Sequence, residues 1–119
     1  MTLTAFIENI KTNGSVTFNE TIAIITDNYD YKATEFTNGL NEDAVVNAAG
    51  TNEGSCKIFA FALLNHLTQQ QTLNLFGDYY HVDVLQFPEG TDHANIRNFI
   101  KYGWDGISYS DKALTLRTK

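Results

Sequence analysis

The chain of 119 residues has one cysteine, one proline and few basic residues. Cys56 cannot form an intramolecular disulfide, which excludes a disulfide-stabilised scaffold and favours a reducing compartment. One proline and eight glycines argue against disorder and low complexity. The longest apolar run, Ile58 to Leu64, is far shorter than the roughly 20 residues of a membrane-spanning helix. We therefore expect a soluble protein that does not enter a membrane.

Basic residues are scarcest in the first half of the chain. Between Thr12 and Cys56 there are seven acidic residues and one base, Lys32, whereas six bases balance six acids from Lys57 onward. Nucleic-acid binding requires a basic face, so we expect no nucleic-acid partner. The first 15 residues lack the basic start and the long apolar stretch of a secretory signal, and we expect none.

Apolar residues make up 43% of the chain, and eight Phe, six Tyr and one Trp supply large rings for a core. The length fits one domain over residues 1–119. Leu3 to Thr12 has the apolar spacing of a helix. Thr17 with Glu20, and Thr68 with Gln71, form the capping-box pattern that opens two further helices, the second of which we expect to end at Gly77.

Other segments have weaker patterns. From Tyr31 the chain reads as irregular, with a small hairpin around Asn38-Gly39 and a short strand or helical turn at 44–46. Residues 78–87 fit either a strand or a helix, and the tail after Ser110 is expected to be exposed. The sequence therefore predicts a mainly α fold, a small orthogonal bundle of about five helices with a minor short β element.

Polar residues concentrate at the starts of two helices, in segments 50–57 and 90–98. We expect Thr51 or Asn52 to cap the first helix, which is apolar on all sides and should run through the centre of the domain. Thr91 or Asp92 should cap the second, which ends at Gly103.

These segments also carry a family resemblance. The blocks at residues 50–64, 75–85 and 90–107, with the Thr17–Thr21 helix start and the Asn38–Leu40 turn, resemble the HopJ family. The family takes its name from a proposed type III effector of plant-pathogenic bacteria. The resemblance implies a mainly helical bacterial protein, located in the cytoplasm or secreted through a type III system into a host cell. It implies no defined reaction.

Three sets of residues are candidates for catalysis. Cys56 lies in the first turn of the central helix, where the dipole favours a thiolate, and His93 could serve as its base with Asn95 or Asp92 as orienter. The alternative interpretation is a buried core cysteine. A metal site could use His81, Asp83, Asp92 and His93, although we expect no metal or other cofactor. An acid–base pair could come from Glu53, Asp78 and Asp92, which fit equally well as charges near helix N-termini.

A binding surface fits the polar segments better. Two converging helix N-termini would offer free backbone N–H groups to an anion, and a network that only locks the helices together is the alternative. The sequence predicts an unknown protein or small-molecule ligand in the cleft between 50–57 and 90–98, with no prediction of oligomeric state. The candidate ligand-binding residues are Asn52, Glu53, Lys57, Asp78, Tyr80, His81, Asn95 and Arg97, with Asn98, Tyr79, Tyr102 and Trp104 as further polar and aromatic candidates.

Overall fold

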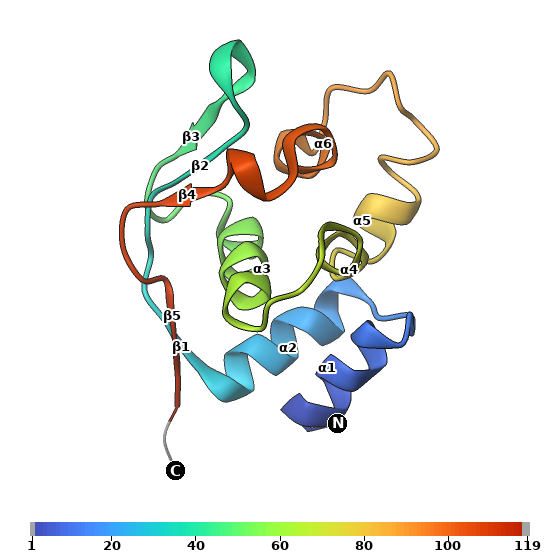
Figure 1. Cartoon of the computed structure of the whole chain (residues 1–119), viewed down its shortest axis with the longest axis vertical. Coiled ribbons are helices and arrows are strands. Elements are labelled where there is room, and N and C mark those ends of the chain that lie inside the picture. Colours follow the sequence, from blue (N-terminus) through green and yellow to red (C-terminus); the bar gives the residue numbers. More distant parts are fainter. Residues whose placement is uncertain (1, 118–119) are drawn as a thin grey trace.

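The computed structural model of the chain describes residues 2–117. Within that range the α-helices are α1 (Leu3–Lys11), α2 (Phe18–Asn28), α3 (Glu53–Leu64), α4 (Gln69–Asn74), α5 (Asp78–His81) and α6 (Ala94–Tyr102). There are also two 3₁₀ turns, η1 (Asn41–Asp43) and η2 (Gly103–Gly106), and η2 directly follows α6. Figure 1 shows α3 in the middle, with α1 and α2 on one side and α6 on the other.

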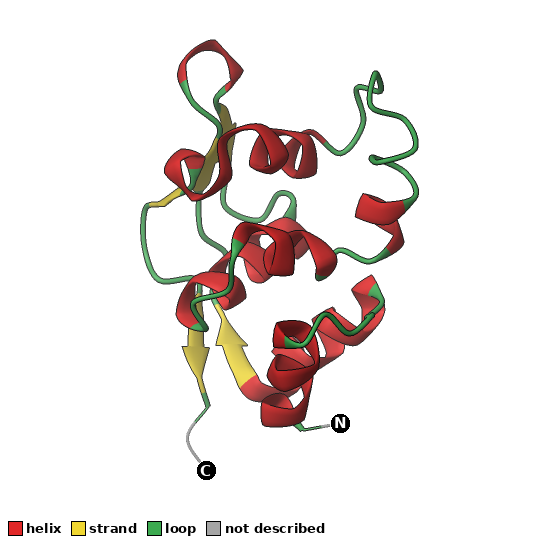
Figure 2. Ribbon diagram, turned by 45° about the vertical axis from the view of Figure 1, so that its right-hand side comes forward, coloured by secondary structure: helices red, strands yellow, loops and turns green. Residues whose placement is uncertain are grey.

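Five short strands form two antiparallel sheets in the described part of the chain. β1 (Tyr29–Tyr31) pairs with β5 (Leu114–Leu116), drawn as two adjacent arrows in Figure 2. In the second sheet, β2 (Phe36–Asn38) lies between β3 (Val45–Asn47) and β4 (Ser108–Tyr109). The two C-terminal strands thus attach the end of the chain to residues 29–38.

The predicted mainly α bundle is therefore wrong, since the fold is mixed α/β. The hairpin expected around Asn38-Gly39 exists as β2 and β3, and 44–46 contributes to a strand. The tail expected to be exposed instead supplies β5, and Ala113 and Leu114 are buried. Strands of two or three residues are too short to show a periodic apolar pattern, and the partners of β4 and β5 lie far away in the sequence.

The N-terminal helices follow their local signals. The Thr17 hydroxyl accepts from the Glu20 N–H, and the Glu20 carboxylate accepts from the Thr17 N–H. Thr68 and Gln71 make the same reciprocal pair at the start of α4. Helix α4 ends at Asn74, before the expected Gly77, and residues 78–87 contain only the one-turn helix α5 followed by turns.

The central position predicted for residues 58–64 is confirmed over most of the helix. Ile58, Phe59, Phe61 and Ala62 of α3 are completely buried, whereas Leu63 and Leu64 are 44% exposed. The Phe59 ring packs against a cage of four other aromatic rings, Phe36, Phe76, Phe99 and Trp104. This packing fixes α3 between α2 and α6 and so positions its N-terminus.

Candidate functional site

Helices α3 and α6 both begin with a residue in the left-handed conformation. Asn52, which precedes α3, has φ 48° and ψ 46°, and His93, which precedes α6, has φ 51° and ψ 49°. Neither side chain caps its helix. The expected side-chain caps are wrong. The Thr51 hydroxyl donates to the Ala48 carbonyl, and the Asn52 amide donates to a side chain. The N-cap position of α6 belongs to His93 and not to Thr91 or Asp92.

These helix starts leave backbone donors free. Within residues 2–117, the N–H groups of residues 53–55 and 94–96 donate to no protein acceptor. The first intrahelical bonds are made only by the N–H of Cys56, to Asn52, and that of Arg97, to His93. Each helix N-terminus therefore presents three N–H groups and the positive end of its dipole.

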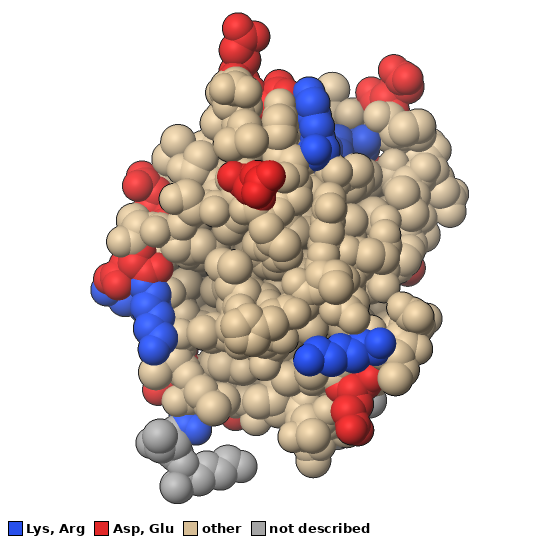
Figure 3. All heavy atoms as spheres, viewed as in Figure 1, with Lys and Arg blue, Asp and Glu red and all other residues tan. Residues whose placement is uncertain are grey.

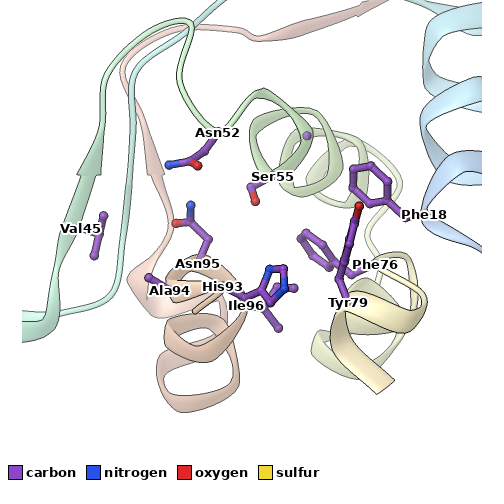
Figure 4. Close-up of a pocket in the computed structure, with 11 residues that line it drawn as sticks. Phe18, Val45, Asn52, Ser55, Phe76, Tyr79, His93, Ala94, Asn95 and Ile96 are labelled. Atoms are coloured by element: carbon purple, nitrogen blue, oxygen red, sulfur yellow. The ribbon is translucent and has the colours of Figure 1, made fainter. Parts of the chain in front are cut away.

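The two helix starts meet at one cavity of about 350 Å³ (Figure 4). Figure 4 shows the Ser55 side chain pointing into it from α3, with the His93 ring opposite. The cavity lies between segments 50–57 and 90–98, where the sequence predicts a cleft, and extends to α2 and α5. Its lining consists of Phe18, Val45, Asn52, Gly54, Ser55, Phe76, Tyr79, His93, Ala94, Asn95 and Ile96.

A network of asparagine side chains forms one wall of the cavity. Asn95, on α6, donates from Nδ2 to Asn47 Oδ1 at 2.9 Å and accepts from Asn38 and Asn47 at 3.0 and 3.2 Å. Asn52 Nδ2 donates to Asn47 Oδ1 at 2.7 Å. The polar residues therefore both lock α6 to α3 and the β2–β3 hairpin and border a cavity, so the two alternatives left open by the sequence coexist.

A second polar group holds the C-terminal half of α6. Asn98 donates to the carbonyls of Asn38 and Asp43, and the Asp43 carboxylate accepts from Lys101 at 2.6 Å and Tyr102 at 2.5 Å. The hydrogen bonds from Lys101 and Tyr102 lower the pKa of Asp43. Asn98 and Tyr102, candidates for a binding pocket, thus serve here to anchor α6.

Aromatic rings form the opposite wall. The Tyr79 ring lies edge-on to Phe18, with centroids 4.9 Å apart, and 5.2 Å from the His93 ring. Tyr79 is 42% exposed, so one side of this stack faces solvent. Gly54 is required beneath Phe18, because a Cβ there would lie 2.9 Å from the ring. Trp104 instead packs in the core, and its indole donates to the Leu67 carbonyl.

His93 is held by an acidic side chain from the preceding loop. Its Nε2 lies 3.1 Å from Asp83 Oδ2 and 3.8 Å from Asp92 Oδ2. Asp92 is itself paired with Arg97 at 2.6 Å, which lowers the pKa of the Asp92 carboxyl. Arg97 also donates to the carbonyls of Asp92 and Phe87, so its guanidinium fastens the 83–92 loop and lies outside the cavity lining.

Cys56 lies on the core side of α3. It is 1% exposed, and its Sγ lies 3.6 Å from the Thr34 carbonyl. Burial raises the pKa of the thiol and also raises the pKa of the neighbouring Tyr109 hydroxyl, which donates to the Cys56 carbonyl. No histidine is among its hydrogen-bond partners. This environment fits the buried core cysteine and not an activated nucleophile.

The remaining candidates are scattered. Asp78 and His81 line a separate cavity of about 320 Å³ beside Glu20. Tyr80 is buried, and its hydroxyl accepts from Gln70. On α3, Lys57 lies over the Tyr31 ring and Glu53 is near the Tyr31 hydroxyl. The candidate set from the sequence is therefore divided between two cavities and the core.

The proposed metal and acid–base groupings do not assemble in the described residues. Asp83 and His93 are in contact, but residues 2–117 contain no group of three or more His, Cys, Asp or Glu side chains placed to hold a metal ion. Glu53, Asp78 and Asp92 each have a different neighbourhood: the Tyr31 hydroxyl, the second cavity and Arg97. We therefore assign neither site.

Several lining residues were not candidates from the sequence. Phe18 and Phe76 resemble ordinary core residues, because their neighbours in the sequence give helical apolar spacing. Ser55 adjoins Cys56 in a helix with apolar residues on every side. Such a helix has no polar face that would indicate which side borders a cavity. The only available signal was the short distance of Ser55 from a helix start.

The surface in Figure 3 bears acidic and basic side chains interspersed around an uncharged centre, without a continuous basic patch on that face. No helix in residues 2–117 combines the length and apolarity needed to cross a membrane. The expectations about nucleic acid and other partners remain predictions.

Comparison with known proteins supports the resemblance seen in the sequence. The chain is similar to a protein of unknown function, VPA0580, whose crystal structure shares 46% sequence identity and a TM-score of 0.92. The match covers 98% of this chain and 95% of that one. No curated protein matches the chain. The family model described as HopJ type III effector protein matches residues 3–114, and the chain therefore belongs to the HopJ family.

Proposed function

We propose that this HopJ-family protein binds a small ligand carrying a carboxylate and a flat apolar group in the cavity between α3 and α6. The observation that carries the proposal is the convergence of two uncapped helix N-termini on one cavity. The N–H groups of five lining residues (54, 55 and 94–96) have no acceptor within residues 2–117 and can donate to an anion, and both dipoles favour negative charge at that point.

The rest of the lining supports the apolar half of the ligand. Phe18, Phe76 and Tyr79 offer ring faces and edges on the side opposite the asparagines. A concave site of this volume with an aromatic wall and a few fixed polar groups is typical of small-molecule pockets. The asparagine network supports binding as well, because it fixes the two N-termini relative to each other before the ligand arrives.

Titration with benzoate, followed in amide-resolved NMR spectra of the whole chain, tests the proposal. We expect saturable shifts at the amides of residues 53–55 and 94–96, with a dissociation constant of roughly millimolar for so small a probe. Benzamide is the neutral control and should shift these amides far less. Equal effects of the two probes, or benzoate shifts confined to other residues, would overturn the proposal.

The family description supports a proposal about location as well. Its members are described as type III effector proteins, and we propose that this chain is delivered by such a system after synthesis in the bacterial cytoplasm. A reporter fusion tests it: the reporter signal should reach host cells from a secretion-competent strain and should be lost in a secretion-deficient one. Equal signals from both strains would overturn this proposal.

A further inference from the structure

The sequence suggested Cys56 as a nucleophile at the start of α3, but the side chain that faces the cavity there is that of Ser55. One residue is about 100° of rotation in an α-helix, so Ser55 faces the cavity while Cys56 faces the core. The Ser55 hydroxyl makes no hydrogen bond with the described residues and is only partly buried. It is the nucleophile-bearing side chain that points into the cavity in Figure 4.

The opposite side of the cavity carries a base that is already oriented. His93 reaches the lining from the start of α6, and its Nε2 contacts Asp83 Oδ2 at 3.1 Å. A carboxylate on one ring nitrogen fixes the tautomer and leaves the other nitrogen, Nδ1, to accept a proton. The Tyr79 ring, tilted by 36° with its centroid 5.2 Å from that of the His93 ring, limits rotation of the imidazole.

The free N–H groups complete the set of parts that acyl transfer needs. An oxyanion forming on a carbonyl attacked by Ser55 would develop beside the first turn of α3, where the N–H groups of Gly54 and Ser55 have no protein acceptor. Donors placed in advance at that point stabilise the transition state more than the ground state.

From this arrangement we propose that the cavity is a serine esterase site, with Ser55 as nucleophile, His93 as general base and Asp83 as the residue that positions His93. The inference rests on the proposed function, because the ester must bind in the same cavity. Ser55 and His93 line the same cavity, and nucleophile–base hydrogen bonds commonly tighten only when a substrate is bound. The substrate class is a small ester of an aromatic or apolar carboxylic acid.

The reaction balances with water as the second reactant. Ser55 Oγ bonds to the ester carbonyl carbon while His93 takes the hydroxyl proton. The carbon–oxygen bond to the alcohol breaks, and the alcohol leaves with the proton from His93. Water then adds to the acyl–Ser55 carbonyl and gives a proton to His93. The serine–acyl bond breaks, releasing the acid, and the proton returns to Ser55. The acid product is the carboxylate that the helix N-termini favour.

A fluorophosphonate probe tests the nucleophile. The Ser55 oxygen should bond to phosphorus while fluoride leaves, and intact-mass spectra of the wild-type chain should show one adduct, mapped to Ser55. S55A should abolish the adduct, H93Q should slow its formation at least 100-fold, and the exposed-site control S108A should react like wild type. Absence of an adduct on wild-type Ser55, or equal labelling of H93Q, would overturn the proposal.

Two further measurements distinguish a failure of the esterase proposal from a failure of the binding proposal. D83N should lower kcat for p-nitrophenyl acetate at least tenfold with KM changed less than twofold, since Asp83 acts through His93; a change in KM alone would overturn its positioning role. Benzoate titration of the wild-type chain is the second measurement. If benzoate binds and Ser55 never reacts, the esterase site is wrong and the binding site stands. If benzoate does not bind, the binding proposal is wrong, and the esterase proposal that rests on it loses its support.

Discussion

The Asn95 side chain joins α6 to both strands of the β2–β3 hairpin. It is 7% exposed, and its amide both donates to Asn47 and accepts from Asn38 and Asn47. Asn38 and Asn47 are themselves buried, so they have no access to water in its place. Loss of this one amide would remove three buried hydrogen bonds, each worth about 0.5–1.5 kcal/mol, although Asn38 and Asn47 keep other partners.

We therefore expect N95A to lower the free energy of unfolding by about 2–3 kcal/mol. Urea denaturation measures the change. The matched control is N19A on α2, where the asparagine is exposed, and it should change stability by less than about 0.5 kcal/mol. Equal effects of the two substitutions would show that the asparagine network does not hold α6.

Asp43 gives a prediction about pH. Its pKa is lowered in the folded protein by Lys101 and Tyr102. A carboxyl with a depressed folded-state pKa stabilises the fold above its unfolded pKa, near 4, and loses that contribution as pH falls through the folded value. D43N should therefore be less stable than wild type at neutral pH, and the difference should shrink below about pH 4.

Thermal unfolding of wild type and D43N between pH 7 and pH 2.5 checks this. High salt should reduce the difference, because the group is exposed and solvent screens it. The neighbouring exposed substitution E42Q is the control and should show no such pH dependence. A stability difference that stays constant over the whole pH range would contradict the assigned contacts.

At the level of elements, the C-terminal strand β5 shows what sequence patterns miss. Leu114 is 1% exposed and belongs to the core, whereas Leu116, two residues later in the same strand, is 56% exposed. The strand is held by pairing with β1, which lies far away in the sequence. Three residues cannot show an apolar period, so the sequence predicted an exposed tail, which is correct for residues 111, 112 and 115–117 and wrong for Ala113 and Leu114.

The exposed Leu116 provides a matched control for a substitution of the buried Leu114 in the same strand. L114A should destabilise the protein by about 2–4 kcal/mol, because it removes buried methyl groups and leaves a cavity. L116A should cost less than about 1 kcal/mol. Chemical denaturation of the two variants measures the contrast. Similar small effects would mean that β5 does not pack on the core.

Some elements were predictable because their causes are local. The reciprocal bonds at Thr17 and Thr68 depend on residues three positions apart, and the burial of most of residues 58–64 follows from their composition. The caps of α3 and α6 were not predictable. Their starts are set by Asn52 and His93 in the left-handed conformation, which Asn13, Asn41 and His66 also adopt.

At the level of the whole molecule, the location of the cavity was predictable and much of its chemistry was not. The two polar segments do meet, but the aromatic wall comes from α2 and α5, and the partner of His93 comes from the 83–92 loop. Whether Ser55 or Cys56 points into the cavity depends on which side of α3 packs against the core. Because α3 is apolar on all sides, its sequence does not determine the rotation of the helix about its axis, which is set only by packing against the surrounding elements.

The cavity between α3 and α6 is the central claim, and filling it tests that claim most directly. S55L places a bulky side chain where the Ser55 hydroxyl points into the cavity, and S108L places the same side chain on the exposed strand β4. In amide-resolved benzoate titrations, S55L should weaken binding at least tenfold while S108L binds like wild type. Undiminished benzoate shifts in S55L would contradict the account.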